Sequence, residues 1–391
     1  MVKNLKSIIF ERLPEHDTCW SLIKGVDAKL YIGVCGEMTG GMSAYVASYD
    51  PVSEKITYLV EMASVLGVPT DNGQGSHSKV HYCLMQDNDG TLYAATHCTG
   101  APLGDWIWRP WNCWTHPQKQ FSGSGLAAFR PDGELLFSEI FLPQEGSRCM
   151  ALAPERRKIY GISCPRNHFF VYDLKKRELR DLGRIGSINP QCIFIDREEN
   201  AYTTDDFGRI IKCLADKEEL IDTGVQIPHA GFRNGYHNTL YDVTPAPDSK
   251  SVFGVTWAWG ERLFRYDLEK NRLYDYGKAY GEENDEWDHI IHSHAGGLVF
   301  GTDGMLYFTA NAESGGKSVP HLIKLNPSDG KRENLGILHH NQMPADHISR
   351  AAADDMGNLY FAETGNTPTK LFRYTPETVG SVKMKSRRLW G

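Results

Sequence analysis

The sequence predicts an all-β fold, a seven-bladed β-propeller whose four-stranded antiparallel blades surround a central channel. The main observation is a short phrase, usually a small or polar residue followed by an aliphatic and an aromatic one, that occurs seven times. Its copies begin at Lys29, Thr91, Lys158, Asn200, Ser251, Met305 and Asn358. A recurrence of roughly 40–60 residues built from short strands is typical of propeller blades. An aromatic content of 11% and 38 glycines also favour strands joined by tight turns.

The residues around each copy of the phrase supply the other strands of a blade. A turn such as Asp303-Gly304 precedes most copies and separates the phrase from an earlier β-prone run. In the sixth repeat we expect strands at residues 298–300, 306–308 and 321–325, followed by a short last strand. Because such repeats fill the chain, residues 1–391 are predicted to form a single propeller domain.

A ring of blades must pair or cover the edge where its first and last blades meet. The candidate closing strands are residues 7–11 and 382–385, one near each terminus. We expect the N-terminal strand to complete the last blade. Deletion of residues 1–12 should then reduce both solubility and stability.

Composition limits the classes of partner. The net charge of −7 is spread along the chain without blocks, which argues against nucleic acid and against an anionic membrane surface. No apolar run approaches the length of a membrane span. The nine cysteines are odd in number and scattered, and the N-terminus is too charged for a signal peptide. A cytoplasmic location with reduced thiols is therefore expected.

Four long segments depart from the repeat. They are residues 68–80, 101–122, 229–238 and 280–292. Loops this long in a compact fold are often functional. Each precedes a first strand or follows a second strand, so we expect all four on the face where the inner strands begin, and the site with them.

Hairpin arithmetic identifies the side chains that should meet on that face. We place the start of each first strand ten residues before the phrase and the end of each second strand six residues after it, so that antiparallel pairing joins these positions. The expected pairs are His81 with His97, Arg148 with Cys164, Tyr241 with Trp257, Ala295 with Asn311, and Ile348 with Thr364. Near these positions also lie His294, His347, Arg166, Asn167 and His168.

These pairs predict a channel mouth rich in His, Arg, Tyr and Trp. Facing neutral imidazoles are candidate bases and ligands, and arginine favours a carboxylate or a phosphate. Tryptophans at 106, 108, 111 and 114 offer either a cap for the blade or a stacking platform for a sugar ring. Whether His168, His237 and His347 belong to the site or to the surrounding loops stays open.

Two spacings permit a metal site without requiring one. Residues 289–294, with the pattern His-x-x-His-x-His, could hold a divalent ion, and Cys98 with Cys113-x-x-His116 could bind zinc. Neither spacing is specific, and several of these histidines could contact substrate directly. We therefore expect no required cofactor, with a divalent metal as the open alternative.

One blade resembles a known family. The segment 77–81 (His-Ser-Lys-Val-His), followed by the turn and phrase of 89–93 and by residues 95–97, resembles the paired-histidine blade of seven-bladed propeller polysaccharide lyases. That group includes ulvan lyases and the lyases that release rhamnose from glucuronate. The resemblance is specific over about one blade and extends to an arginine of the next blade, with Arg166 as the first match and Arg148 as the second. For the family's tyrosine, Tyr160 falls in the core phrase and Tyr241 at the mouth.

The resemblance implies cleavage of a 4-linked uronate by β-elimination, with a 4,5-unsaturated uronate as product. A base removes the proton at C5, a cation neutralises the carboxylate, and an acid protonates the leaving oxygen at C4. The implied catalytic residues are His81 and His97 as base and acid in unresolved order, Arg166 at the carboxylate, and Tyr241. Candidate substrate-binding residues are His77, Arg148, Asn167, His168, Trp257 and His294. The expected partner is a short, imported oligosaccharide that contains a uronate, cleaved from its end.

Two other functions stay open. A metal-dependent lactonase, or another small-molecule hydrolase or lyase, would gather its ligands at the same mouth and would be sensitive to chelators. A non-catalytic interaction propeller would have near-identical blades and an ordinary polar rim. The blades of this chain diverge, and their charged and aromatic residues are expected on one face, so the site must decide the function.

Overall fold

The computed structural model of the chain describes residues 2–37, 42–68, 74–98, 120–187, 190–228, 239–257, 261–281, 295–314 and 317–377. These residues form two compact units, which are described separately. One comprises residues 9–189 with 364–370, and the other comprises residues 1–8, 190–363 and 371–390, each within the described ranges. The prediction of a single domain over residues 1–391 stays a prediction.

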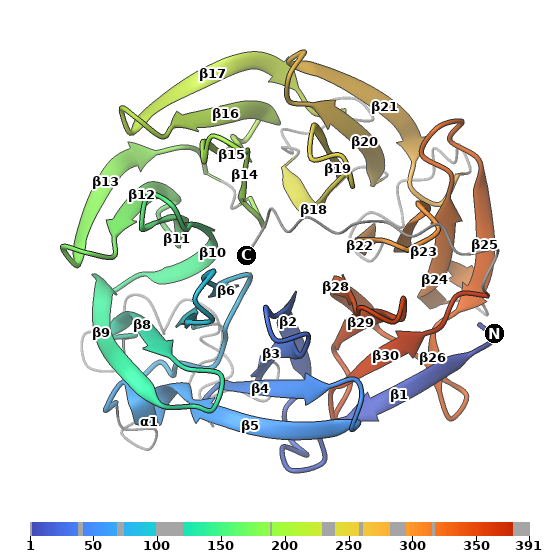
Figure 1. The fold of residues 1–391 in the computed structure, drawn as a ribbon, viewed down its shortest axis with the longest axis horizontal. Coiled ribbons are helices and arrows are strands. Elements are labelled where there is room, and N and C mark those ends of the chain that lie inside the picture. Colours follow the sequence, from blue (N-terminus) through green and yellow to red (C-terminus); the bar gives the residue numbers. More distant parts are fainter. Residues whose placement is uncertain are drawn as a thin grey trace. The chain divides into compact units, whose positions relative to one another are not determined.

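The unit of residues 9–189 contains three sets of four antiparallel strands, each paired in chain order (Figure 1). The second and third sets are separate four-stranded sheets, whereas the first continues into a larger sheet through a bridge from Thr18 to Thr364. The first sheet contains β2 (Thr18–Lys24), β3 (Leu30–Cys35), β4 (Tyr45–Asp50) and β5 (Lys55–Glu61). The second contains β6 (Leu84–Gln86), β7 (Leu92–Ala95), β8 (Gly123–Phe129) and β9 (Leu135–Pro143). The third contains β10 (Gly146–Ala153), β11 (Lys158–Cys164), β12 (His168–Asp173) and β13 (Glu178–Arg184). A four-residue helix, α1 (Met62–Val65), follows β5.

The other unit repeats this arrangement. Its first two sheets are β14 (Phe194–Ile195), β15 (Ala201–Thr204), β16 (Arg209–Leu214) and β17 (Glu219–Gln226), then β18 (Leu240–Pro245), β19 (Ser251–Thr256), β20 (Arg262–Asp267) and β21 (Arg272–Lys278). The next sheet contains β22 (Ala295–Phe300), β23 (Leu306–Ser314), β24 (Lys317–Leu325) and β25 (Arg332–Ile337). A small hairpin of β26 (His339–His340) and β27 (Met343–Pro344) precedes the last sheet. That sheet contains β28 (His347–Ala353), β29 (Leu359–Thr364), β30 (Lys370–Tyr374) and the N-terminal β1 (Leu5–Ile9).

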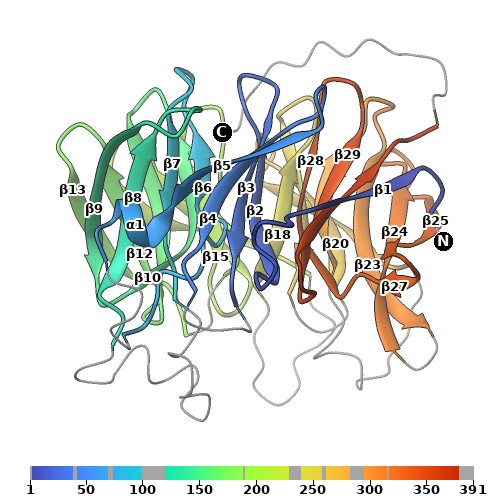
Figure 2. The same cartoon turned by 90° about the horizontal axis from the view of Figure 1, so that it is seen from below.

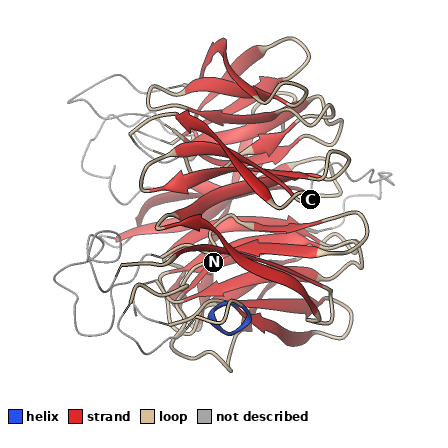
Figure 3. Ribbon diagram, turned by 90° about the vertical axis from the view of Figure 1, so that its left-hand side faces the viewer, coloured by secondary structure: helices blue, strands red, loops and turns tan. Residues whose placement is uncertain are grey.

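The described residues are almost entirely strand and turn, with α1 as their one helix (Figure 3). This confirms the prediction of an all-β fold made of four-stranded antiparallel sheets. The side view shows β3, β4 and β5 of the residue 9–189 unit side by side (Figure 2). No helix within the described ranges has the length and apolar character needed to cross a membrane.

The recurring phrase marks the second strand of every sheet. Each of these strands, β3, β7, β11, β15, β19, β23 and β29, begins at the first or second residue of its copy. The aliphatic residue of the phrase is buried, as Leu30, Leu306 and Leu359 show, and so is the aromatic ring beside it. The prediction that these seven copies start a strand is confirmed.

The turn before the phrase holds the phrase tyrosine by its hydroxyl group. The O–H donates to an aspartate oxygen in four sheets, from Tyr31 to Asp27 at 2.9 Å, Tyr202 to Asp196 at 2.8 Å, Tyr307 to Asp303 at 2.9 Å, and Tyr360 to Asp354 at 2.9 Å. A bond of this kind to a charged acceptor stabilises a fold by about 1–3 kcal/mol. The contact explains why an acidic turn accompanies the phrase in the sequence.

The N-terminal strand pairs with β30, which confirms that it completes the last sheet. It covers Leu5–Ile9 and therefore starts two residues earlier than predicted. The backbone N–H of Thr375 donates to the carbonyl of Asn4 at 3.2 Å and extends this edge. The alternative closing strand, residues 382–385, lies outside the described residues.

Four of the five predicted cross-strand pairs are wrong, because the first strands and their approaches do not form unbroken ladders. The fifth pair, Ile348 with Thr364, stays a prediction. In the third sheet Cys164 pairs with Gly146, and the register shifts between Ser147 and Cys149, which leaves Arg148 in the bulge. A bulge opposes two residues on one strand to a single residue on the other and turns the extra side chain out of the ladder. The ten-residue rule located this position correctly but assumed an unbroken ladder.

Other sheets show the same interruption. Tyr241 occupies a bulge between Leu240 and Asp242. The backbone N–H of Trp257 therefore donates to the carbonyl of Thr239, and Trp257 does not pair with Tyr241. In the next sheet Ala295 pairs with Ala310 rather than with Asn311, and the shift follows at Gly296. In the second sheet the partner of His97 is Lys79, not His81.

The cysteines within the described ranges are buried thiols, and no disulfide joins any two of them. They are Cys19, Cys35, Cys83, Cys98, Cys149, Cys164, Cys192 and Cys213. The cytoplasmic location that was inferred from the sequence stays a prediction.

Candidate functional site

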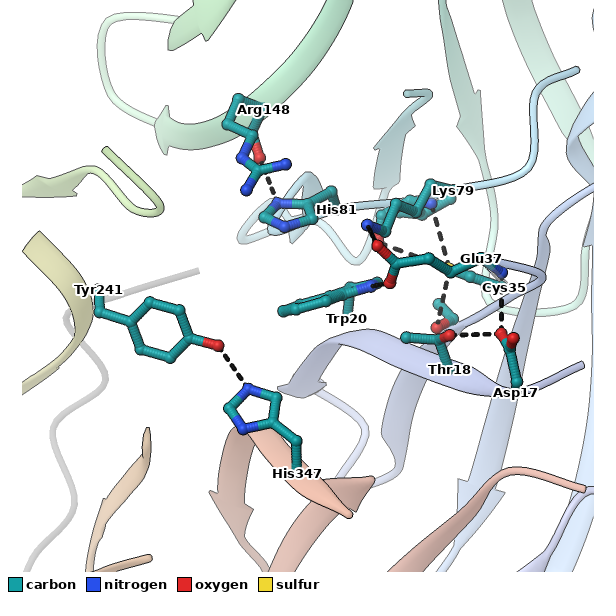
Figure 4. Close-up of polar contacts among 12 residues, drawn as sticks. Asp17, Thr18, Trp20, Cys35, Glu37, Lys79, His81, Arg148, Tyr241 and His347 are labelled. Atoms are coloured by element: carbon teal, nitrogen blue, oxygen red, sulfur yellow. Dashed lines mark hydrogen bonds and ion pairs between the residues drawn. The ribbon is translucent and has the colours of Figure 1, made fainter. Parts of the chain in front are cut away.

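Two first strands of the residue 9–189 unit, and the segment that leads into a third, each place one side chain out of the ladder; the three side chains are Trp20, Arg148 and His81. Trp20 lies in the bulge of β2, between Cys19 and Ser21, and Arg148 lies in the bulge of β10. His81 lies between Lys79, which pairs with His97, and Cys83, whose carbonyl accepts from Ala95. The chain thus advances four residues from Lys79 to Cys83, while the opposite chain advances only two, from His97 to Ala95. Tyr82, within the longer stretch, has a positive φ of 32°. Figure 4 shows these side chains gathered in one cluster.

His81 is the residue at the centre of the cluster. Its Nδ1 lies 2.6 Å from the carbonyl oxygen of Arg148. A carbonyl only accepts, so Nδ1 carries the proton and Nε2 carries the lone pair. Nε2 is buried and has no hydrogen-bond partner among the described residues. A buried polar atom without a partner is uncommon and often marks a functional position.

His97 and Arg148 complete the polar part of the cluster. The ring centroids of His81 and His97 are 6.0 Å apart with an edge-on orientation. His97 packs so closely on Gly146 that a Cβ at that glycine would lie 2.3 Å from the imidazole Nδ1. Only glycine fits at position 146, so the start of β10 is shaped around this histidine.

Both imidazoles are held in the neutral form. Burial lowers the pKa of His81 well below its ordinary value, and the positive charges of Arg148 and Lys79 lower it further. Burial, Arg148 and Lys79 act in the same direction on the pKa of His97. The Arg148 guanidinium thus lowers the pKa of both His81 and His97. The cluster therefore combines an uncharged base with a nearby cation.

A tryptophan, a glutamate and a lysine support His81 from the other side. The indole of Trp20 stacks on the His81 ring, with centroids 4.6 Å apart and planes at 29°. Glu37, just after β3, accepts from Trp20 Nε1 at 2.7 Å and from Lys79 Nζ at 2.6 Å. The Lys79 ammonium also lies 4.5 Å from the centre of the indole ring. We call Trp20, Glu37 and Lys79 the indole clamp.

The indole clamp holds a charged pair in a buried place. Lys79 is 1% exposed. Burial lowers the pKa of Lys79 below its ordinary value, although the Glu37 carboxylate opposes this. Burial alone would raise the pKa of Glu37, but the Lys79 ammonium outweighs it and the pKa lies below its ordinary value. The Glu37 carboxylate is therefore ionised at neutral pH, and its 2.6 Å contact with Lys79 Nζ favours the ammonium form of the lysine.

The sequence rules missed all three residues of the clamp. Trp20 lies nine residues before its phrase at Lys29, whereas Arg148 lies ten before Lys158, because the first hairpin is one residue shorter. A search that allowed this one-residue difference would have found Trp20. Glu37 lies beyond the repeat, and no spacing signal points to it.

His77 is buried in a hydrogen-bond network of the same unit. Its Nδ1 lies 2.8 Å from Thr96 Oγ1 and its Nε2 lies 3.2 Å from Ser122 Oγ. Burial lowers the pKa of His77 to about 4. Both ring nitrogens therefore have protein partners, and the predicted role in substrate binding stays a prediction.

The residues after β11 make local contacts. Arg166 is 62% exposed and pairs with Glu145 at 2.9 Å. Asn167, with a positive φ of 60°, donates from its side chain to the carbonyl of Gly186 at 3.3 Å. His168 bonds to Asp181 at 2.7 Å on the neighbouring strand. Their predicted substrate contacts stay predictions, and the structure brings Arg148 rather than Arg166 to the two imidazoles.

A second polar cluster lies in the other unit. The Tyr241 hydroxyl is hydrogen-bonded to His347 Nε2, and both residues are buried (Figure 4). Beside Tyr241, the buried Asp242 is paired with Arg350. Burial raises the pKa of Asp242, and Arg350 opposes this shift. Trp257 is half-buried against the apolar core of this unit.

Within the described ranges, no three His, Cys, Asp or Glu side chains come together in a way that could hold a metal ion. Both predicted metal sets depend on residues outside those ranges, since residues 289–294 and residues 113 and 116 are not described. His294, His237 and the four tryptophans of the 101–122 segment are outside them as well. These predictions stay open.

No protein-family profile matches the chain, and no curated protein does. Solved structures do resemble it. "Streptogramin B lyase structure" superposes with a TM-score of 0.61 at 11% identity, over 94% of this chain and 96% of that one. The WD40 repeats of RRP9 give 0.58 at 10% identity, over 95% and 97%.

A third similar structure is the extracellular domain of a putative hybrid two-component system from B. thetaiotaomicron, with a TM-score of 0.60 at 13% identity. The match covers 95% of this chain but only 40% of that one, so the chain spans less than half of that domain. Identities this low carry information on fold alone. WD40 repeats are β-propellers, and the four-stranded sheets and these superpositions agree that the chain has the β-propeller fold.

Proposed function

We propose that the chain is a seven-bladed propeller and a carbon–oxygen lyase, which cleaves a 4-linked uronate by β-elimination. The observation that carries the proposal is the lone pair of His81 Nε2. It is buried, has no partner among the described residues, and belongs to an imidazole whose pKa is lowered well below its ordinary value. An unprotonated base beside an arginine is what this elimination needs.

His81 acts as the base. Nδ1 is held by the carbonyl of Arg148, so Nε2 is the atom that accepts the proton from C5 of the uronate. A neutral imidazole at physiological pH requires no prior loss of a proton. The Arg148 carbonyl then stabilises the imidazolium that forms, because it accepts from the N–H on the other side of the ring.

Arg148 neutralises the uronate carboxylate. The C5 proton is only weakly acidic, and charge develops on the carboxylate as the proton leaves. A guanidinium binds a carboxylate through paired hydrogen bonds and stabilises that developing charge. Arg148 supports this role better than Arg166, because its charge acts on both imidazoles while Arg166 is exposed and paired with Glu145.

The electron pair of the broken C5–H bond forms the C4=C5 double bond as the C4–O bond breaks. The leaving oxygen then takes a proton. The imidazolium of His81 is far more acidic than a sugar hydroxyl and returns the proton it has taken, while the neutral His97 can only donate a hydrogen bond to the leaving oxygen. The products are an unsaturated uronate and a shortened or released sugar, and no oxidant or reductant is needed.

The substrate class follows from the same groups. One arginine and uncharged imidazoles favour an anionic ligand with hydroxyl groups, which fits a short oligosaccharide containing a uronate. We place such an enzyme in the cytoplasm as part of the same proposal.

The experiment is a measurement of ultraviolet absorbance during incubation with rhamnose-capped glucuronate, ulvan fragments and oligogalacturonate, with and without a chelator. A rise from the conjugated product that survives the chelator, and that is lost in His81→Ala and Arg148→Met, is expected. His321→Ala is the matched control, since its imidazole bonds to Asn334 in the other unit. The proposal fails if the folded protein gives no rise on any substrate, and a rise that requires metal points to the metal-dependent alternative.

A further inference from the structure

The indole clamp has one carboxylate and two donors. Glu37 Oε2 accepts from Trp20 Nε1, and Glu37 Oε1 accepts from Lys79 Nζ. Each oxygen therefore holds a different group. Because Lys79 also lies over the indole ring, the three side chains are mutually in contact and form a closed set.

The clamp acts on His81 through the indole. Trp20 is a bulge residue, so its side chain is turned out of the regular ladder. Its Nε1–H bond to Glu37 fixes the plane of the ring, and that plane packs on the imidazole at 4.6 Å. The imidazole itself has one hydrogen bond within the described residues, through Nδ1 to Arg148. The stacked indole is thus a further restraint on its orientation, together with the Tyr82 ring, whose centroid also lies 4.6 Å from that of the imidazole.

A similar group of an acid, an aromatic ring and a lysine occurs in the other unit, where it has a structural role. Asp303 accepts from Tyr307 at 2.9 Å and pairs with Lys324 at 3.0 Å, and the Lys324 ammonium lies 5.6 Å from the Tyr307 ring centre. The Tyr307 ring packs against Tyr374 in the core. The set thus repeats the clamp's chemistry but supports another core ring. In the indole clamp the ring supports the His81 imidazole, whose Nε2 has no hydrogen-bond partner among the residues that the structure describes.

We infer that Glu37 is a positioning residue, which clamps the Trp20 indole against His81 and so keeps Nδ1 on the Arg148 carbonyl and Nε2 available. The assignment of His81 as a base rests on the proposed function, but the clamp itself is a statement about geometry. It can therefore be tested without substrate.

A glutamine at position 37 breaks the clamp in a defined way. Its side chain has one acceptor oxygen, and its amide N–H groups repel a second donor. In Glu37→Gln, Trp20 and Lys79 compete for that oxygen, and the buried ammonium binds it more strongly. In the double variant Lys79→Met with Glu37→Gln, the competitor is gone and the oxygen is available to Trp20. The double variant thus restores the indole contact without restoring the charges.

The measurement is nuclear magnetic resonance of protein labelled with ¹⁵N in histidine and tryptophan. In the wild type we expect a single Nδ1–H tautomer for His81 and a protected Trp20 indole N–H. In Glu37→Gln the indole N–H should exchange about tenfold faster or more, and His81 should show a mixture of tautomers. The double variant should return both signals toward the wild type. Asp303→Asn is the matched control and should leave both signals unchanged.

The inference is overturned if Glu37→Gln leaves the tautomer and the indole exchange as they are, or if the double variant is as disturbed as the single one. Where the wild type cleaves a uronate, kcat should fall about tenfold in Glu37→Gln with little change in KM, and recover in the double variant. A wild type without activity that still shows the expected resonance pattern would refute the lyase and leave the clamp standing. If the wild type cleaves a uronate but Glu37→Gln has the same resonance pattern as the wild type, the lyase stands and the clamp is refuted.

Discussion

Two buried histidines, His81 and His347, differ in what their Nε2 atoms meet. His347 Nε2 is hydrogen-bonded to the Tyr241 hydroxyl, within the residue 190–363 unit. His81 Nε2, in the other unit, has no partner among the described residues. Burial and residue type are the same in both places, so neither identifies a reactive group. What separates them is whether Nε2 already has a hydrogen-bond partner among the described residues.

The difference has an energetic side. An unpaired polar atom in the interior costs about 1–3 kcal/mol, whereas a satisfied one is close to neutral or favourable. His347 therefore contributes to the stability of its unit, while His81 reduces the stability of the other. Such a cost at one position, surrounded by a clamp that fixes it, is common where a site is arranged for chemistry.

The largest expected effect separates the two histidines by activity. His81→Ala should lower kcat of uronate cleavage about a thousandfold, because a positioned general base contributes that much. His347→Ala should leave kcat within about threefold of the wild type while reducing stability, because it removes the partner of a buried hydroxyl. Kinetics by absorbance and urea unfolding of both variants check this. Equal losses of activity would end the distinction.

The next effect concerns the charge beside His81. Arg148→Met should reduce kcat/KM about a hundredfold, since the uronate carboxylate loses its partner. It should also move the acid limb of the pH profile. The guanidinium holds the pKa of His81 down, so its removal raises that pKa, and activity should begin to fall at a higher pH than in the wild type.

The wild type should keep its kcat/KM from pH 8 to below the ordinary imidazole range. Profiles of both proteins, with Arg166→Met as the control, provide the measurement. If the acid limb moves for Arg166→Met and not for Arg148→Met, the assignment of the carboxylate-binding arginine has to be exchanged.

His77, a third buried histidine, extends the comparison to the pH dependence of the free energy of unfolding. His77 has partners on both nitrogens, and burial lowers its pKa to about 4. The unfolded chain binds this proton near pH 6.5, so between these values the unfolded state holds more protons and the free energy of unfolding decreases as pH falls. The loss from this residue between pH 7.5 and pH 5 should be about 2 kcal/mol.

His77→Gln keeps polar groups for Thr96 and Ser122 and removes the titration. The variant should lose less stability on acidification than the wild type, as judged from urea midpoints at the two pH values. His168→Gln serves as the control, since that imidazole lies at the surface beside Asp181. The same pH dependence in wild type and His77→Gln would mean that His77 gains its proton without unfolding the site.

The smallest effect comes from Tyr241. Tyr241→Phe removes the hydroxyl that bonds to His347 and should lower the free energy of unfolding by about 1 kcal/mol, with kcat nearly unchanged. Circular dichroism during urea unfolding and the absorbance assay provide the two readouts. Loss of activity at full stability would instead support the catalytic role that the sequence suggested for Tyr241.

The strands of the sheets could be predicted from the sequence because each strand is specified by residues close to it in the chain. The phrase that begins at Lys158 or Ser251 combines a buried aliphatic residue, a core ring and a preceding turn, and each copy carries that information itself. The position of Arg148 followed from the same arithmetic. Its geometry did not, because the bulge that turns it out of the ladder leaves no mark in the spacing.

The rest of the candidate site depends on contacts between different hairpins. Glu37 follows β3 and reaches Lys79, which precedes β6, and nothing in either local sequence indicates the other. The lone pair of His81 is available only because Nδ1 is held by a carbonyl 67 residues away. Such arrangements arise from packing between sheets and become visible only when the chain is folded.

The bulges carry a consequence for how such a molecule can change. Trp20, Arg148 and Tyr241 are each the inserted residue of a first strand, and the ladder on both sides of them is formed by other residues. A side chain at such a position can be exchanged while the pairing of its neighbours is kept. Substitutions at positions 20, 148 and 241 can therefore change the side chains that a blade presents while its strand pairing is kept. A small library of variants at these positions would test new substrates on an almost unchanged backbone.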